Sequence, residues 1–181
     1  TLKGDVWSFT TINQMPSDPS LVGWWKMDDQ TGSMAWDYSG QGHSGTFVGG
    51  AAIVADGKGS ALSLNGTTGY VNAIGYKGIL GAAGRTTCAW IKTSKAGGII
   101  SWGTNTAGQK WHMRVDTTFE IRTGVSGGYV LGTTKVNDNQ WHHIAAVIAD
   151  DGSPTSNEIK TYVDGIPETY TASVSLAMNT I

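Results

Sequence analysis

Cysteine is the scarcest residue type with a structural role in this 181-residue chain, which contains only one. A single cysteine excludes an internal disulfide, so the folded state depends on its core alone. Cys88 lies in the run Thr86–Ile91 (TTCAWI), and we interpret it as a small buried apolar residue. A reactive thiol is the alternative interpretation.

Long apolar runs are also missing. No stretch approaches the roughly 18 apolar residues that a transmembrane helix requires, so we expect no membrane insertion. No signal peptide is present, and the chain begins with Thr1 in place of Met. We therefore expect a mature or excised piece of a longer polypeptide, with neighbouring domains on the same chain.

Charged residues make up only 14% of the chain, and the formal net charge is −2. This balance lacks the basic excess with which proteins bind nucleic acids or anionic membrane surfaces. Proline is rare (4), whereas glycine (26) and tryptophan (8) are abundant. This composition is typical of an extracellular or cell-surface β protein. The length suits one large β-sandwich with a sizeable core.

Short alternating apolar runs that end in turn dipeptides predict an antiparallel all-β sandwich or barrel. The run Leu21–Met27 is the first clear strand. Tight turns are expected where Gly follows Asp or Asn, at residues 56–57, 65–66, 151–152 and 164–165. Residues 75–84, with Gly at every third position, predict a loop or a short helix.

In the middle of the chain, the alternation assigns the two faces of a hairpin. The core face is expected to hold Trp111, Met113, Val115, Phe119 and Ile121. The opposite, polar face is expected to hold His112, Arg114, Glu120 and Arg122. A loop of residues 116–118 would set Val115 opposite Phe119 and Arg114 opposite Glu120.

Six segments carry a likeness to a known family. They are Leu21–Asp29, Trp36–Phe47, Gly59–Gly66, Cys88–Lys92, Gln140–Ala145 and Tyr162–Gly165. In this order and spacing they resemble the laminin-G-like jelly-roll family of the concanavalin A-like superfamily. The resemblance implies an antiparallel two-sheet jelly-roll β-sandwich, a fold that hosts lectins, carbohydrate-binding modules, adhesion domains and hydrolases. Family members usually close with a strand reading roughly Ile-Asp-Glu-Val-Arg-Ile-Tyr, which this sequence lacks.

The ends of the chain set the expected domain boundaries. Residues 1–15 form one predicted strand, and a Ser/Pro linker follows at 16–20. The strand resembles the end of a fibronectin-III-like module, which implies that it belongs to a preceding domain. The alternative is that it pairs as an edge strand of the jelly-roll domain, which we expect at residues 21–181.

Glycoside hydrolysis needs two carboxyl groups about 5–10 Å apart around the scissile bond. In hydrolases that share this fold, the acids come from a strand reading Glu-x-Asp-x-x-Glu. The glutamates of the chain are Glu120, Glu158 and Glu168, and none begins such a pattern. We therefore expect a non-catalytic domain, with a glycoside hydrolase or lyase as the alternative. His142 and His143 face opposite sides of their predicted strand, so we expect them to be structural.

The loop Asp37-x-Ser39-Gly40-x-Gly42 is the best metal candidate. Calcium takes about six to eight oxygen ligands, and a Gly-rich loop can turn several carbonyl groups inward. In the family that the chain resembles, a loop carboxylate and backbone carbonyls often hold structural calcium. This implies Asp37 as the carboxylate, with the carbonyls of Gln41 or His43. The alternative is an Asx turn in which Asp37 caps its own loop. Asp28 and Asp29 are adjacent acids that could add ligands.

Aromatic side chains are the expected sugar contacts, because their apolar faces stack on pyranose rings. Trp36, Trp102 and Tyr129 lie in Gly-rich surroundings, and the alternative for each is packing under a loop. The pattern places Trp25, Trp90 and Trp141 in the core. We predict a glycan-binding or adhesion module with the ligand residues Trp36, Trp102, Tyr129, His112 and Arg114. An extracellular protein ligand is second, and a passive spacer is a further alternative.

Overall fold

The computed structural model describes residues 18–28, 32–56 and 59–181. The chain divides into two compact units, the first ending at Tyr76 and the second spanning Lys77–Ile181. The strand predicted for residues 1–15 lies outside the described residues, as does the start of the predicted linker. The described secondary structure consists of β-strands and one short 3-10 turn. None of it forms a helix with the length and apolarity needed to cross a membrane.

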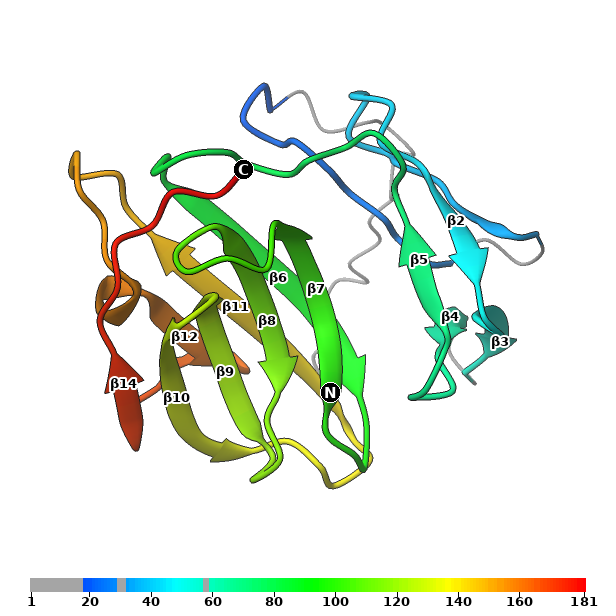
Figure 1. Ribbon diagram of the computed structural model, residues 1–181. Helices are drawn as coiled ribbons and strands as arrows, with labels where there is room; N and C mark the ends of the chain where they lie inside the picture. The colour runs from blue at the N-terminus through cyan, green and yellow to red at the C-terminus, as the bar shows by residue number, and fades with distance from the viewer. Residues whose placement is uncertain (1–17, 29–31, 57–58) are drawn as a thin grey trace, which may run out of the picture. The chain divides into compact units, whose positions relative to one another are not determined.

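Five short strands lie in the described part of the first unit (Figure 1). They are β1 (Met34–Ala35), β2 (Gly45–Val48), β3 (Ala52–Ala55), β4 (Ser60–Ser63) and β5 (Tyr70–Asn72). One antiparallel sheet has the order β1-β2-β5, and β3 pairs with β4 separately. The strand predicted at Leu21–Met27 is reduced to one bridge between Trp25 and Asp37. Met27 has a φ of 57°, which interrupts the extended backbone there.

Two antiparallel sheets make up the second unit (Figure 1). The five-stranded sheet consists, in spatial order, of β14 (Ala172–Val174), β10 (Gly128–Lys135), β9 (Glu120–Val125), β8 (Lys110–Val115) and β7 (Gly97–Gly103). The four-stranded sheet consists of β13 (Ile166–Pro167), β12 (Lys160–Val163), β11 (Trp141–Ile148) and β6 (Arg85–Lys92). The 3-10 turn η1 (Ser156–Glu158) precedes β12.

One apolar core lies between these two sheets. The five-stranded sheet contributes Trp111, Met113, Val115, Ile121, Val125 and Val130. The four-stranded sheet contributes Ile144, Ala146, Ile148 and Val163. Burying each of the larger side chains contributes about 1.5–3 kcal/mol before the loss of conformational entropy is counted. Two antiparallel sheets that share one core confirm the predicted all-β sandwich.

The predicted Asx-Gly turns form where the structure describes them. The Asn65 side chain accepts hydrogen bonds from three following backbone N–H groups, and Gly66 takes a φ of 73°. Asp164 and Gly165 both have positive φ, at 52° and 79°, and they join β12 to β13 as a two-residue turn. Short-range chemistry was sufficient to predict these positions.

The predicted pairing of β8 with β9 is wrong by two residues. Val115 lies opposite Ile121, and Arg114 lies opposite Arg122. The connecting loop is longer than predicted, because Phe119 takes a φ of 80° and the backbone N–H of Asp116 bonds to the carbonyl of Glu120 at 2.8 Å. Since strand side chains alternate with period two, the shift leaves every residue of the two strands on its predicted face.

The burial predicted for Trp90, Trp141 and Cys88 is wrong. Trp90 is 65% exposed, Trp141 is 39% exposed, and Cys88 is exposed too. The inward positions of β6 are smaller or polar, at Arg85, Thr87, Ala89 and Ile91. Alternation holds on these strands, but side-chain size suggested the wrong face, because the largest aromatic residues point away from the core.

A buried arginine joins the loop before β6 to the end of the chain. Arg85 is 4% exposed, and its guanidinium donates hydrogen bonds to the carbonyls of Ile79, Gly81 and Ala83 and to the Thr180 hydroxyl. Burying a cation without hydrogen-bond partners is costly. Here three carbonyls and a hydroxyl supply these partners in place of a carboxylate. Residues 75–84 form the predicted loop, held in this way.

Candidate functional site

Three of the residues predicted to bind ligand share the outer face of the five-stranded sheet. Residues directly opposite each other on neighbouring strands share a face. Arg114 lies opposite Arg122, and His112 lies opposite Gly124, which in turn lies opposite Tyr129. The core residues of the same strands point to the other side. We call His112, Arg114, Arg122 and Tyr129 the basic strip.

Asp116, at the end of β8, holds the two arginines of the basic strip together. Its carboxylate lies 3.2 Å from a terminal nitrogen of Arg114 and 3.4 Å from one of Arg122. Burial opposes ionisation, but hydrogen bonds from the Thr117 N–H and the two guanidinium groups outweigh it and lower the pKa of Asp116. Two cations therefore share one carboxylate, and the buried Nε atoms of Arg114 and Arg122 have no hydrogen-bond partner in the described structure.

Tyr129 contributes an aromatic ring to the strip. The guanidinium carbon of Arg122 lies 3.6 Å from the centroid of the Tyr129 ring, which is a close cation–π contact. Gly124 lies between Tyr129 and His112 in the cross-strand row, where a side chain would collide with the backbone at Gly128 and Tyr129. The strip thus combines planar donors with one ring and a residue without a side chain.

The pKa of His112 depends on its burial and on the charges of this face. Burial, together with the positive charges of Arg114, Arg122 and Lys110, lowers the pKa of His112 to about 4. The imidazole is therefore neutral at neutral pH. Burial is the largest cause of this shift, and the three neighbouring cations add to it, although the whole chain has a formal net charge of −2.

Glu120 departs from its predicted role as a polar partner of Arg114. It is 8% exposed and lies opposite Lys135 on β10. Its Oε2 atom is buried without a hydrogen-bond partner in the described structure. Because the β8–β9 register differs from the predicted one, Arg114 bonds to Asp116 in place of Glu120.

Trp102 takes the alternative that the sequence left open, packing under a loop. Its ring stacks on Trp111 with centroids 5.8 Å apart, and its Nε1 donates to the carbonyl of Ile79 at 3.0 Å. Gly78 lies so close that a Cβ there would be 2.3 Å from the ring. We therefore remove Trp102 from the expected sugar contacts.

The Asp37 carboxylate is fully engaged by donors. It accepts backbone N–H groups of Trp24, Ser39 and His43 at 2.8–2.9 Å and the Ser39 hydroxyl at 2.9 Å. The side chain has no exposed surface. Burial opposes ionisation, yet these hydrogen bonds outweigh it and lower the pKa of Asp37. This geometry is that of the Asx turn, the alternative to calcium.

Of the two backbone carbonyls predicted as calcium ligands, that of His43 already accepts a hydrogen bond. The Gln41 side chain is exposed, and its backbone N–H bonds to the Ser39 hydroxyl. The carbonyl of His43 accepts the Trp25 Nε1 at 2.8 Å, and its ring stacks on Tyr76 with centroids 3.7 Å apart.

No group of three or more His, Cys, Asp or Glu residues in the described chain is arranged to hold a metal. As they lie, the Asp37 carboxylate and the His43 carbonyl are engaged by donors within the protein and are not arranged as calcium ligands. Asp29 lies outside the described residues. Calcium here stays a prediction for experiment.

A second charged cluster was not foreseen. The two ring nitrogens of His142 lie 2.8 Å from Asp164 and 3.0 Å from Asp138. Hydrogen bonds to the carboxylate of Asp164, and to that of Asp138, outweigh burial and raise the pKa of His142. We call these residues the His142 triad; the i,i+4 spacing of Asp138 and His142 was its one sequence signal. The predicted structural role of His142 fits this geometry, and the backbone N–H of His143 also bonds to Asp164.

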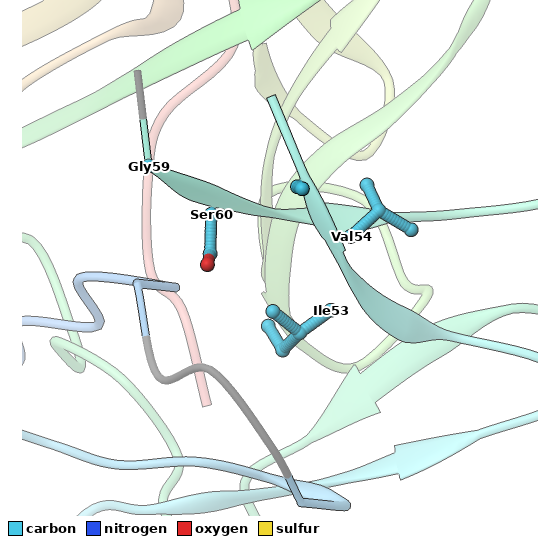
Figure 2. Close-up of a pocket in the computed structure, with 5 residues that line it drawn as sticks. Ile53, Val54, Gly59 and Ser60 are labelled. Carbon is cyan, nitrogen blue, oxygen red and sulfur yellow. The ribbon is translucent and has the colours of Figure 1, made fainter. Parts of the chain in front are cut away.

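Two hollows in the surface lie away from the predicted ligand residues. One, of about 300 Å³, lies beside the β3–β4 hairpin and is lined by Ile53, Val54, Ala55, Gly59 and Ser60 (Figure 2). The other, of about 530 Å³, lies near η1 and includes Glu158, Lys160 and Tyr170. Among the described residues, the lining of the first holds no charged or aromatic side chain, so no ring stacking and no ion pair from these residues distinguishes it.

The chain is similar in sequence to one protein family and in fold to a solved structure. The sequence model of the Laminin_G_3 family, described as the concanavalin A-like lectin/glucanases superfamily, matches residues 65–179. The alignment with a solved S-layer domain-containing protein from Clostridium thermocellum covers 84% of this chain and 73% of the chain of that protein. The sequence identity is 16% and the TM-score is 0.45. No curated protein matches the sequence.

Proposed function

Because the chain belongs to the Laminin_G_3 family of the concanavalin A-like lectin/glucanase superfamily, we propose that its second unit binds an acidic glycan on the basic strip. Binding would occur without cleavage, as part of a larger protein exposed outside the cell. One observation carries the proposal: two opposed guanidinium groups share a single carboxylate on an outer sheet face.

The chemistry of the strip favours an anionic ligand. A guanidinium group offers five N–H donors in a planar fork that matches carboxylate and sulfate oxygens. Asp116 occupies only part of this capacity, and the Arg114 side chain is still 41% exposed. Tyr129 adds an apolar ring of the kind that packs on sugar C–H groups. A polymer of uronic acid or sulfated sugars presents both features.

The described acids support binding without catalysis. A glycosidase needs a carboxylic acid whose pKa is raised, so that it can donate a proton at neutral pH. Every described carboxyl group with a resolved shift has a lowered pKa, and this includes Asp116, the partner of the two arginines of the strip. Glu168 is bonded to Thr133 and Thr134, and Glu158 caps η1.

The proposal is tested by affinity electrophoresis of the full chain in gels that contain polygalacturonate or heparin, with polymer-free gels as the comparison. We expect retardation by an acidic polymer, and Arg122→Ala should weaken it about tenfold, as loss of a charged hydrogen bond predicts. Lys160→Ala is the control, because it removes an exposed cation of the other sheet.

Equal losses from Arg122→Ala and Lys160→Ala would mean non-specific charge attraction and would reject the strip. Absence of retardation in both acidic polymers would favour a protein ligand or a passive spacer. Release of reducing ends by the purified protein would reject the non-catalytic part of the proposal.

A further inference from the structure

The first unit presents exposed aromatic residues beside the Trp25–Asp37 bridge. On this antiparallel pair, Trp24 falls opposite Tyr38 and Lys26 falls opposite Trp36. Trp24 is 38% exposed and Trp36 is 51% exposed, whereas Ala35 is 1% exposed. The Asp37 side chain has no exposed surface. Alternation therefore turns Trp36 and Tyr38 outward. We call Trp24, Lys26, Trp36 and Tyr38 the aromatic platform.

Rings and polar groups are mixed on this platform. The rings of Trp24 and Tyr38 meet edge to face, with centroids 6.2 Å apart and an interplanar angle of 69°. The Lys26 ammonium lies 4.7 Å from the Tyr38 centroid and 6.0 Å from that of Trp24. It also lies 3.1 Å from a carboxylate oxygen of Asp28. Apolar ring surface, a donor and an acceptor thus lie within one small area.

The backbone beneath the platform is held in place by Asp37. Its carboxylate accepts the N–H of Trp24 from one segment and the N–H of Ser39 from the other. A further backbone bond joins Tyr38 N–H to the Trp24 carbonyl at 2.8 Å. The two segments are therefore tied together before any ligand arrives, which lowers the entropic cost of binding.

We infer that the aromatic platform is a second glycan site, specific for a neutral polysaccharide and independent of the basic strip. Pyranose rings present C–H faces to aromatic rings and hydroxyl edges to polar groups, and the platform offers both kinds of partner. Lys26 is paired with Asp28, so the platform, unlike the strip, has no local excess of cations. A stable protein interface needs about 20–30 residues on each side, far more than these four side chains supply.

The test uses the full chain in native gels that contain mixed-linkage β-glucan, galactomannan or dextran. We expect at least one neutral polymer to retard the wild type, and Trp36→Ala to weaken this about tenfold. Trp36→Phe should restore part of the affinity, because it restores a ring. Trp90→Ala is the matched control, since Trp90 is an exposed tryptophan on the other unit. Near-UV circular dichroism verifies that each variant is folded.

Two further comparisons separate this site from the basic strip. Arg122→Ala should leave neutral-polymer binding unchanged, and Trp36→Ala should leave acidic-polymer binding unchanged. Failure of all three neutral polymers to bind the folded wild type would overturn the inference, as would equal losses from Trp36→Ala and Trp90→Ala. Neither result would bear on retardation by polygalacturonate or heparin.

Discussion

The basic strip and the His142 triad have opposite charge ratios. In the strip, two guanidinium groups share the carboxylate of Asp116. In the triad, the carboxylates of Asp138 and Asp164 share one imidazole. The strip therefore has two cations for one carboxylate, with the Arg114 side chain still 41% exposed, whereas both nitrogens of the triad's imidazole already have partners.

The two histidines report this difference. Burial and neighbouring cations lower the pKa of His112 to about 4, whereas hydrogen bonds to carboxylates raise the pKa of His142. The same residue type thus has a lowered pKa in one region and a raised pKa in the other. The comparison teaches that a cluster with unused donors is a candidate for binding, and a saturated one is a candidate for stability.

Removing the charge of the Asp37 carboxylate should have the largest effect on stability. In this third arrangement, a buried carboxylate is held by N–H and O–H donors and not by a cation. We expect Asp37→Asn to lower the free energy of unfolding by about 3 kcal/mol, since several bonds to a buried charge are weakened together. Chemical denaturation measures this. With the loop closed in this way, a chelator should leave the Tm of the wild type unchanged.

A calcium-dependent rise in Tm that Asp37→Asn abolishes would instead establish the predicted calcium site. The reason is that a ligand which binds only the native state stabilises it by mass action. Asp28→Asn serves as the control, because it removes a neighbouring carboxylate outside the loop.

Asp116→Asn should remove the one negative charge that Arg114 and Arg122 share. Two opposed guanidinium groups would lose their shared partner, and we expect a loss of about 2 kcal/mol in the free energy of unfolding. In the folded fraction, the freed donors should strengthen retardation by polygalacturonate. If stability fell and acidic-polymer binding also weakened, Asp116 would have to be part of the binding surface itself, contrary to the comparison.

Protonation of His112 in acid should lower the stability of the protein. Its folded pKa of about 4 lies below the ordinary 6.5, so its contribution is present above pH 6.5 and is lost as the pH falls to about 4. We expect about 1–2 kcal/mol of the stability of the wild type to disappear across this interval. His112→Gln should make the profile flatter, as measured by urea denaturation at several pH values. An unchanged slope would contradict a pKa of His112 lowered by burial and by the neighbouring cations.

Replacing His142 of the triad should have the smallest effect on stability. Its pH dependence should be opposite to that of His112. The raised pKa of His142 means that its contribution is present below pH 6.5 and is lost as the pH rises through the folded value. Because Asp138 and Asp164 are exposed, solvent screens the pairs, and we expect His142→Gln to cost less than about 1 kcal/mol. The difference in Tm from the wild type should be larger at pH 6 than at pH 9. A difference that grew with pH would contradict the assigned protonation.

Much of the architecture was predictable from local patterns. Alternation placed Trp111 and Met113 in the core and Arg114 outside it, and Asx-Gly pairs placed the turns. Trp90 was misplaced because its size suggested the core, while its register with β11 puts it on the outer face. For Trp102 the sequence left exposure and packing under a loop open, and the structure shows the second, with Gly78 close to the ring.

The candidate sites followed the same division. His112 and Arg114 were identified on an outward strand face, which period two determines without knowledge of partners. Tyr129 was identified only from its Gly-rich surroundings, and the structure places it in β10. Their grouping depended on pairings between β8, β9 and β10, and the role of Asp116 on a loop longer than predicted.

The sequence by itself determined a two-sheet sandwich and the direction in which most strand residues point, because alternation and turn chemistry act over a few neighbouring residues. Tertiary structure alone decided which charges share a partner. Asp164 reaches His142 from 22 positions away, and Arg122 reaches Asp116 around a loop. Strand register sets such distances, and it depends on the packing of the whole sheet.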